Sequence, residues 1–473
     1  MPTASHQALA PAHLLSLAIA TAMLAPAAHA DFVADSKASL TTTNIYLNRD
    51  FREGTSSQQN KREEWGQGFW LDVQSGYTEG TVGFGLDALG VVGVKLDSGG
   101  GRTGTDLLPV QDDGGTPDQF GRLGLTAKVK VSNTELRYGS HVPELPVVKA
   151  SDSRLLPQVF EGGLLTSSEL DGLTFVGGRL DKVIDRASTN SEDIVLNSKN
   201  RRFAAGVSAD HLDLLGLDYQ FNQNLKGRYF HAELDDIYRQ HFVGMVATQP
   251  WGPGTFGADL RLAVSDDQGQ AKAGNIDNTT VNGMLSYALG GHKVSAAYQH
   301  LSGDSAFPYI DGADPYLVNF VQINDFAGAE ERSWQARYDY DFAKLGIPGL
   351  SFMSRYLSGD NIKLRNGDTG KEWERNSEIK YVVQSGTFKD LSLRFGTTTH
   401  EALAEDHDGP SQVFSLSWAM AGRELTLQVE QQQSYGHAVL FVITGLGLSM
   451  CCGALLFVGL RRWARDFSSR TTQ

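Results

Sequence analysis

Apolar and polar residues alternate along most of the chain, in segments of about ten residues separated by turns. The clearest segment runs from Ser333 to Phe342. One of its faces is aromatic or small and the other is polar: Trp334, Ala336, Tyr338, Tyr340 and Phe342 against Gln335, Arg337, Asp339 and Asp341. A period of two residues is typical of β-strands, and the pattern predicts about eighteen of them between Ser36 and Met420.

The repeat of this pattern, with no long helical segment beside it, favours an all-β transmembrane antiparallel β-barrel. A soluble sheet of this size would need a covering layer. Connections also alternate between short turns and long loops, as they do at the two rims of a barrel; Ser132-Asn133 and Gly290-Gly291 are short, whereas 97–118 and 303–330 are long. The mean hydropathy of −0.26 agrees with a barrel, because lipid-facing and lumen-facing residues average out.

One long connection, His141 to Leu170, is unusually apolar for a solvated loop. It contains the pairs Val147-Val148, Leu155-Leu156 and Leu164-Leu165. Two interpretations stay open: the loop folds inward and packs against the barrel wall, which narrows the pore, or it forms a cap packed on its own side chains.

The N-terminal residues 1–30 have the features of a secretory signal peptide. An apolar stretch from Leu14 to Ala20 leads to Ala28-His29-Ala30, which fits the small-x-small cleavage rule and predicts a mature protein that begins at Asp31. The segment before the apolar stretch carries no Lys or Arg. The 2 cysteines of the chain, Cys451 and Cys452, are adjacent, so no disulfide scaffold is expected.

The C-terminal end departs from a simple barrel. Ser411 to Met420 alternates and can serve as the closing strand, which leaves residues 421–473 as an atypical extension. Within it, residues 438–460 are uncharged and are followed by Arg461 and Arg462, which predicts an apolar helix long enough to span a bilayer. A frameshift, a gene fusion, a degraded copy or an accessory anchor would each explain this extension.

Net charge and motifs restrict the function. A formal charge of −14 argues against nucleic acid as a partner. The chain has no G-x-S-x-G, H-E-x-x-H or lysine-paired serine motif, so we expect no enzyme, no catalytic residue and no cofactor. Acidic loop residues such as Asp266-Asp267 lack a repeating ligand spacing, and no metal site is expected.

Six longer motifs follow in order along about 31–420: Arg62–Phe69, Gly101–Val110, Glu135–Gly139, Ser153–Gln158, Ala232–Gln240 and Ser333–Phe342. Together they resemble one known family, the OprD-type outer-membrane porins, also called outer-membrane carboxylate channels. The resemblance implies an eighteen-stranded barrel that takes up small carboxylates past a ladder of basic side chains. The segment Gly101–Asp113 is most similar to the branch associated with benzoate, vanillate and related aromatic acids.

The predicted ladder has two sources. Strand parity places six basic residues on polar faces: Lys128, Lys130, Arg137, Arg337, Lys380 and Arg394. Resemblance to the family adds Arg355 and Arg375. A row of cations can draw an anion in and release it at each step, and guanidinium groups offer carboxylates a two-pronged contact. Gly396 stands where relatives often place a second arginine, so the ladder is expected to be one rung short.

Each of these cations has an alternative role in a structural ion pair with an inward carboxylate such as Asp259, Glu233 or Asp339.

Three interpretations of the whole chain follow: a carboxylate-selective channel, a general porin or structural barrel, and a channel made defective by its extension. The expected location is the outer membrane of a Gram-negative bacterium. The expected partners are small anionic solutes, outer-membrane lipid and lipopolysaccharide, and the barrel-assembly machinery, with the chain as a monomer or a trimer.

Overall fold

The computed structural model describes residues 32, 35–50, 59, 61–386, 389, 391–401, 411–420 and 423–431. The expected signal peptide at 1–30, the expected helix at 438–460 and both cysteines lie outside these residues. Within them, no helix is both long and apolar enough to cross a membrane.

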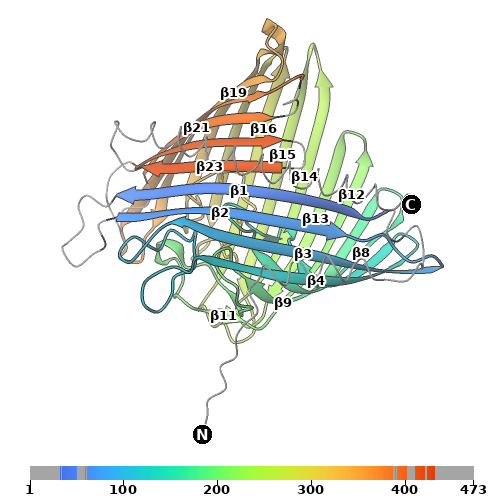
Figure 1. Cartoon of the computed structure of the whole chain (residues 1–473). Coiled ribbons are helices and arrows are strands. Elements are labelled where there is room, and N and C mark those ends of the chain that lie inside the picture. The colour runs from blue at the N-terminus through green and yellow to red at the C-terminus, as the bar shows by residue number, and fades with distance from the viewer. Residues whose placement is uncertain are drawn as a thin grey trace.

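One antiparallel sheet of 19 strands dominates the described part of the chain, which confirms the expected all-β barrel fold (Figure 1). Each strand pairs with the next along the chain, as in β1 (Lys37–Asp50) with β2 (Lys61–Gln74). The first half of the sheet continues with β3 (Val82–Asp97), β4 (Gln119–Val131), β5 (Thr134–His141), β8 (Val159–Leu170), β9 (Leu173–Ile184), β12 (Leu212–Asn222), β13 (Leu225–Leu234) and β14 (Tyr238–Trp251). The second half comprises β15 (Gly254–Asp267), β16 (Asp277–Leu289), β17 (His292–Ser302), β18 (Arg332–Asp341), β19 (Leu350–Lys363), β20 (Thr369–Val382), β21 (Ser392–Glu401), β22 (Ser411–Met420) and β23 (Arg423–Gln431).

The remaining elements are short and belong to the connections. They are β6 (Glu144–Leu145) with β7 (Val148–Lys149), β10 (Ile194–Val195) with β11 (Ser208–Ala209), and the 3-10 helices η1 (Lys199–Arg201) and η2 (Phe342–Leu345).

The wall closes between β23 and β1, which lie side by side (Figure 1). The expected closing strand, Ser411–Met420, is present as β22, but the chain adds β23 beyond it in register with β22. Part of the expected extension, residues 423–431, is therefore wall. Because consecutive strands alternate in direction, an odd number makes the first and last strands run the same way.

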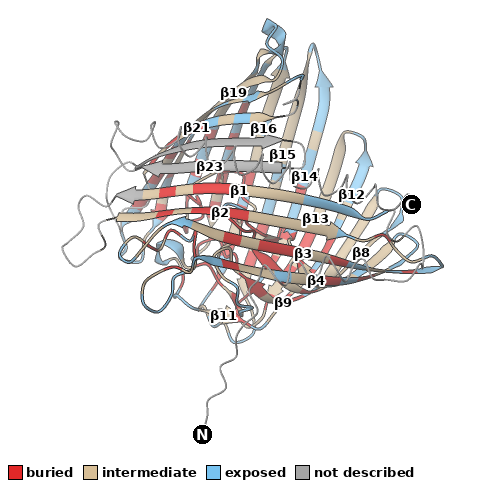
Figure 2. Cartoon of the chain, viewed as in Figure 1, coloured by how far each residue is buried: buried red, intermediate tan, exposed pale blue. Residues whose placement is uncertain are grey.

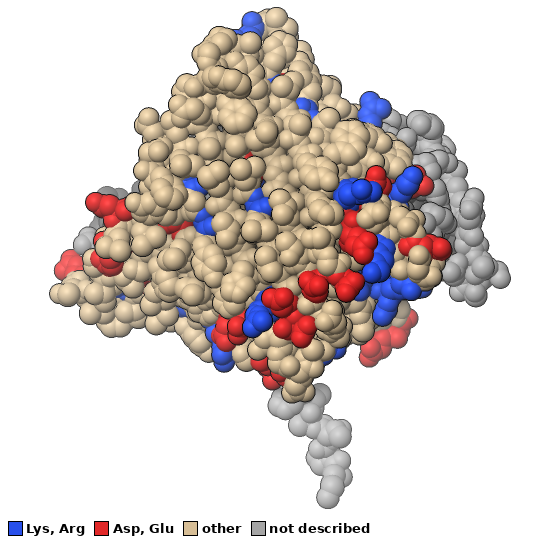
Figure 3. All heavy atoms as spheres, turned by 180° about the vertical axis from the view of Figure 1, so that it is seen from behind, with Lys and Arg blue, Asp and Glu red and all other residues tan. Residues whose placement is uncertain are grey.

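The two faces of the wall differ as the alternation predicts. On β4, Leu123 and Leu125 are 40% and 51% exposed, whereas Thr126 and Lys128 are buried on the opposite face. Figure 3 shows a broad outer surface with few charged atoms and a charged edge. This surface suits lipid, because a closed sheet pairs its backbone hydrogen-bonding groups within the wall and leaves apolar side chains outside.

The hydrophobic core lies inside the barrel, under the long loops. Leu107 and Leu108 from the β3–β4 loop pack with Leu155 and Leu156 from the β5–β8 loop against the inner side of the wall at Val91. A second cluster joins the β9–β12 connection to the wall and to the loop before β18. In Figure 2, the buried segments of the strands gather toward the end that carries the long loops.

The connection between β5 and β8, residues 142–158, folds inward and is called the first inner loop below. Its Leu155 lies on inward-facing glycines of β2: a Cβ added to Gly68 would be 2.2 Å from the Leu155 carbonyl oxygen. Of the two interpretations of this connection, the inward fold against the wall is the one observed. The loop ends earlier than expected, because Leu164 and Leu165 belong to strand β8.

The connection between β17 and β18, residues 303–331, is the second inner loop, and a buried carboxylate ties it to the β9–β12 connection. Asp325 accepts a hydrogen bond from Tyr309 at 2.6 Å and pairs with Lys199 at 2.6 Å and Arg202 at 2.9 Å. Burial alone would raise the pKa of Asp325, but Lys199 and Arg202 outweigh that effect and lower it to about 2. This cluster, called the Asp325 clamp, holds two distant loops together.

We predict that Gly68→Ala widens the lumen. The added methyl group competes with the Leu155 carbonyl for the same space, and such overpacking costs about 1–3 kcal/mol unless the first inner loop moves away from β2. Single-channel recording should show a higher or less steady conductance than in the wild type. Gly100→Ala is the control, because a Cβ at Gly100 meets no atom within 4 Å. Equal conductance in both variants and the wild type would contradict the prediction.

We also predict that the Asp325 clamp opens in acid. The folded pKa of about 2 lies below the ordinary value of 3.8, so the clamp contributes stability above about pH 4 and loses it as the pH falls toward 2. The contribution is on the order of 2 kcal/mol. Hydrogen exchange of segments 199–209 and 309–325, corrected for intrinsic rates, should show protection at pH 5 that falls at pH 2.5 and is lost below pH 2. Asp325→Asn should lack that protection already at pH 7. If neither the lower pH nor the substitution changes the protection, the Asp325 clamp is excluded.

Candidate functional site

The two inner loops meet inside the wall. The backbone N–H of Asp314 donates to the carbonyl of Lys149 at 2.9 Å, and the side-chain amide of Gln158 donates to the carbonyl of Asp311 at 2.8 Å. Lys149 Nζ also lies 3.4 Å from the Asp314 carboxylate. Burial raises the pKa of Asp314, an effect that Lys149 opposes. The loops thus partition the lumen together.

The second inner loop is fixed to the inner face of the wall by hydrogen bonds. Glu374 on β20 accepts from the backbone N–H groups of Ile323 and Asn324 at 3.1 and 2.8 Å. On β16, Asn282 accepts from the N–H of Val318 at 3.1 Å. Both wall side chains are buried, so this loop is a constant part of the lumen surface.

A cavity of about 310 Å³ remains between the second inner loop and the wall strands β15, β18 and β19. Its lining is rich in cations and aromatic rings, and we call it the lumen cavity. The residues that matter for charge and shape are Lys149, Asp259, Arg261, Tyr316, Phe320, Arg337 and Arg355. Three of these arginines come from strands, where backbone pairing fixes their positions.

Arg355 differs from the other arginines of the lumen cavity because it has neutral partners. Its Nε donates to the side-chain oxygen of Asn376 at 2.7 Å, and its Nη2 donates to the carbonyl of Val321 at 3.2 Å. Among the described residues, no carboxylate forms an ion pair with it. The carboxylates near it, such as Glu374, act on its positive charge only at longer range and through Asn376.

Arg337 and Arg261 each carry a carboxylate partner on the same strand. Arg337 contacts Asp339 through two hydrogen bonds of 2.7 and 2.8 Å, and Arg261 contacts Asp259 through two of 2.6 and 3.0 Å. These pairs fit the alternative role proposed for Asp339 and Asp259. Glu233 does not fit this ion-pair role. Its sequence neighbours Ala232 and Leu234 are buried on the inner face of β13, so Glu233 points outward.

Tyr316, at the tip of the second inner loop, organises two arginines of the wall. Its ring lies 4.1 Å from the guanidinium of Arg261, and its hydroxyl accepts a hydrogen bond from Arg228 at 3.0 Å. Arg228 also forms a forked pair with Asp218. Arg261 and Arg228 are not among the eight residues of the predicted ladder. The alternation of residues along β15 could have identified Arg261 as inward-facing. The local sequence around Arg261 gives no indication of its contact with Tyr316.

The early members of the predicted ladder lie elsewhere, toward the short turns. Lys128 and Arg137 share the buried carboxylate of Asp87, each at 2.7 Å. Lys130 lies over the ring of Tyr77 at 5.6 Å. These cations face the lumen as parity predicts, but two of them neutralise Asp87.

The late members Lys380 and Arg394 face inward and stand directly opposite each other on β20 and β21. Arg394 lies 3.4 Å from Glu378. Neither residue lines the lumen cavity. They extend the positive row toward the turn side.

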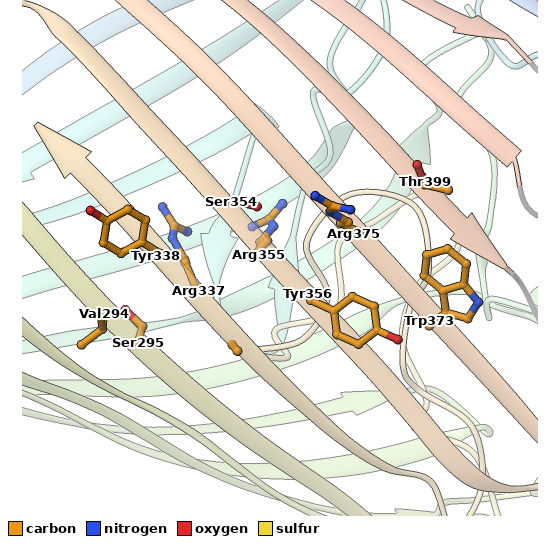
Figure 4. Close-up of a pocket in the computed structure, with 11 residues that line it drawn as sticks. Val294, Ser295, Arg337, Tyr338, Ser354, Arg355, Tyr356, Trp373, Arg375 and Thr399 are labelled. Carbon is orange, nitrogen blue, oxygen red and sulfur yellow. The ribbon is translucent and has the colours of Figure 1, made fainter. Parts of the chain in front are cut away.

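Arg375 requires a correction. Its neighbours Glu374 and Asn376 are buried on the inner face, so alternation along β20 turns Arg375 outward, where it is exposed. It stands beside Tyr356 of β19 and Thr399 of β21 in the register of the sheet (Figure 4). The family resemblance, not parity, had placed it in the ladder, and it does not face the lumen.

The described residues contain no group of three or more His, Cys, Asp or Glu side chains that could hold a metal ion. What the lumen cavity offers instead is fixed positive charge beside aromatic rings, within a wall and two loops that exclude bulky solutes.

Comparison with known proteins agrees with this geometry. A crystal structure of OccK5 (OpdH) from Pseudomonas aeruginosa is 54% identical, with a TM-score of 0.69 over 79% of this chain and 94% of that one. A BenF-like porin from Pseudomonas fluorescens Pf-5 is 40% identical, with a TM-score of 0.76 over 81% and 98%. Pseudomonas aeruginosa OpdK, solved with vanillate, is 39% identical, with a TM-score of 0.72 over 79% and 96%.

The family model that matches, over residues 30–414, is described as outer membrane porin, OprD family. Porins are channels rather than enzymes, and they lie in the outer membrane. The chain belongs to the OprD family of outer-membrane porins, β-barrel channels for small molecules.

Proposed function

We propose that this channel admits small carboxylates, in particular benzoate-like aromatic acids, by passive diffusion. The observation that carries the proposal is the free positive charge of Arg355 in the lumen cavity, next to the compensated arginines Arg337 and Arg261. A carboxylate that enters the cavity can contact the guanidinium of Arg355, with which no protein carboxylate forms an ion pair.

The mixture of free and compensated cations suits transport better than a row of free ones. A guanidinium without a counter-ion attracts the anion, and neighbours already paired with Asp339 and Asp259 attract it more weakly. The anion is therefore bound firmly enough to be selected and weakly enough to leave. A carboxylate can also form two parallel hydrogen bonds with a guanidinium, which a halide cannot.

Aromatic selectivity rests on Tyr316 and Phe320, whose rings line the same cavity. A flat ring attached to the carboxylate can pack on these rings while its charge contacts arginine. The similarity to OpdK, which was solved with vanillate, supports this part of the proposal.

A general porin with little selectivity is the second candidate. The observation in its favour is that half of the expected ladder lies within ion-pair distance of a carboxylate, namely Lys128, Arg137, Arg337 and Arg394. A channel made defective by its C-terminal residues is the third, and it predicts that full-length protein opens no pore at all.

We predict that Arg355→Gln lowers the preference for anions. Removing one unpaired charge at close range from the permeating ion should reduce the benzoate-to-arginine permeability ratio about five- to tenfold. The ratio is measured from reversal potentials in planar bilayers containing the full-length protein. Lys371→Gln, which removes one positive charge from the outer face of β20, is the matched control and should leave the ratio unchanged.

Either of two outcomes would contradict the proposal of selective uptake. If Arg355→Gln and Lys371→Gln give the same ratio as the wild type, the pore is a general one. If the wild type opens no pore, the third candidate holds.

We predict that Tyr316→Leu weakens the preference for benzoate over acetate about threefold, because one aromatic contact in a wet cavity is worth about 0.5–1 kcal/mol. Tyr316→Phe keeps the ring but loses the hydrogen bond from Arg228, so it separates stacking from loop positioning. The benzoate-to-acetate permeability ratio should fall in the leucine variant alone. Equal ratios in all three proteins would remove the aromatic part of the proposal.

A further inference from the structure

Arg375 lies on the part of the outer surface that faces lipid. On β20 the outward positions near it are Lys371, Trp373, Ser377 and Ile379, and Tyr381 follows at the turn end. Lys371 is close to the end that carries the long loops, which in bacterial barrels is the extracellular side. Arg375 lies two residues beyond Trp373, roughly 7 Å along the strand, toward the centre of the membrane.

The surroundings of Arg375 do not neutralise it. Among the described residues, no carboxylate forms an ion pair with Arg375. Two outward carboxylates on the neighbouring strands have other partners: Glu401 accepts a hydrogen bond from the indole N–H of Trp373 at 2.7 Å, and Asp360 pairs with Arg332 at 3.2 Å. A lipid-facing arginine is unfavourable away from the membrane surface, so a counter-ion supplied from the lipid side would stabilise it.

A groove of about 720 Å³ runs from Thr399 on β21 past Arg375 and across β19 and β18 to Val294 on β17 (Figure 4). Its outward residues are small or aromatic: Ala336, Tyr338, Ser354, Tyr356 and Trp373. The rings of Tyr356 and Trp373 stack with centroids 6.1 Å apart and an interplanar angle of 22°. We call this feature the outer groove. Its outward cation, Arg375, lies near the β21 side and the apolar Val294 lies at the β17 side, while Arg337 and Arg355 of the lining belong to inward positions of their strands.

Such a groove matches an amphipathic ligand. A phosphate of the lipid headgroup would contact Arg375, whose long side chain can reach toward the membrane surface, and Lys371 stands four residues nearer that surface on the same face. An acyl chain would lie over Ala336 and Ser354 between the tyrosine rings. The phosphate of the ligand would then lie nearer the membrane surface, and its acyl chain would lie nearer the centre of the membrane.

We propose that the outer groove binds a phosphorylated glycolipid of the outer leaflet, with its phosphate on Arg375 and one acyl chain along the floor of the groove. The charge of Arg375 and the order of cation, aromatic ring and apolar end favour a lipid over a second protein chain. Nothing in this proposal depends on which solute passes through the lumen.

The test is native mass spectrometry of the detergent-solubilised full-length protein, titrated with bisphosphorylated lipid A. Arg375→Gln should weaken binding about fivefold or more, because it removes a charge-assisted contact with phosphate, and Arg375→Lys should restore most of it. Arg332→Gln is the matched control: Arg332 is an outward cation on the neighbouring region of the wall but already pairs with Asp360 at 3.2 Å. It should bind lipid A like the wild type.

Three results would overturn the proposal. Dephosphorylated lipid A could bind the wild type as tightly as the bisphosphorylated form does. Arg375→Gln and Arg332→Gln could bind lipid A equally well. Arg375→Gln could change the number of chains in the complex while lipid binding stays the same, which would make the outer groove an interface between copies of this chain. The open-channel conductance of each variant checks that the barrel has formed.

Discussion

The structure depends on one constraint: a sheet in a membrane must satisfy its backbone hydrogen bonds within itself. Pairing of consecutive strands in a sheet that curves into a barrel achieves this along the wall, and it gives every strand an outward and an inward face. The outward face carries exposed Leu, Val, Phe and Tyr side chains. The inward face carries charged residues such as Asp87, Lys128 and Arg337, and it also supports the long loops that fill the lumen. Position on a strand, and not local composition, therefore decides what each residue does.

Inside the wall, the loops determine which charges act on a solute. The first inner loop rests on glycines of β2, and the second is held by buried side chains of β16 and β20. Where the tip of the second loop approaches the wall, Tyr316 and Val321 contact arginines of the strands. Compensation by Asp339 and Asp259 leaves the cations unequal. The resulting cavity is polar, positive and small, which are the properties that a selective diffusion channel needs.

The sequence allowed much of this fold to be predicted, because period-two alternation survives in each strand and needs no tertiary information. Ser333–Phe342 shows this best: its faces are those of β18. The same parity placed Lys128, Arg137 and Arg337 inside. It did not reveal their partners, since Asp87 and Lys128 meet only across strands. Arg375 was predicted to face the lumen from the family resemblance, although its parity on β20 places it outside. The contact of Tyr316 with Arg261 joins a loop to a distant strand, and alternation within a strand contains no information about such a contact. Strand β23 was missed for a different reason: the family pattern ends before it.

The position of β23 beside β1 also bears on how the barrel forms. Every other neighbour pair in the wall is a hairpin whose strands follow each other in the chain, so it can form soon after its residues become available. The seam between β1 and β23 joins opposite ends of the sheet, and its loop-closure entropy is the largest in the molecule. Until that seam closes, the intermediate exposes two unpaired strand edges. Pairing of β23 with β1 therefore ends the period in which these two edges are open to pairing with other chains.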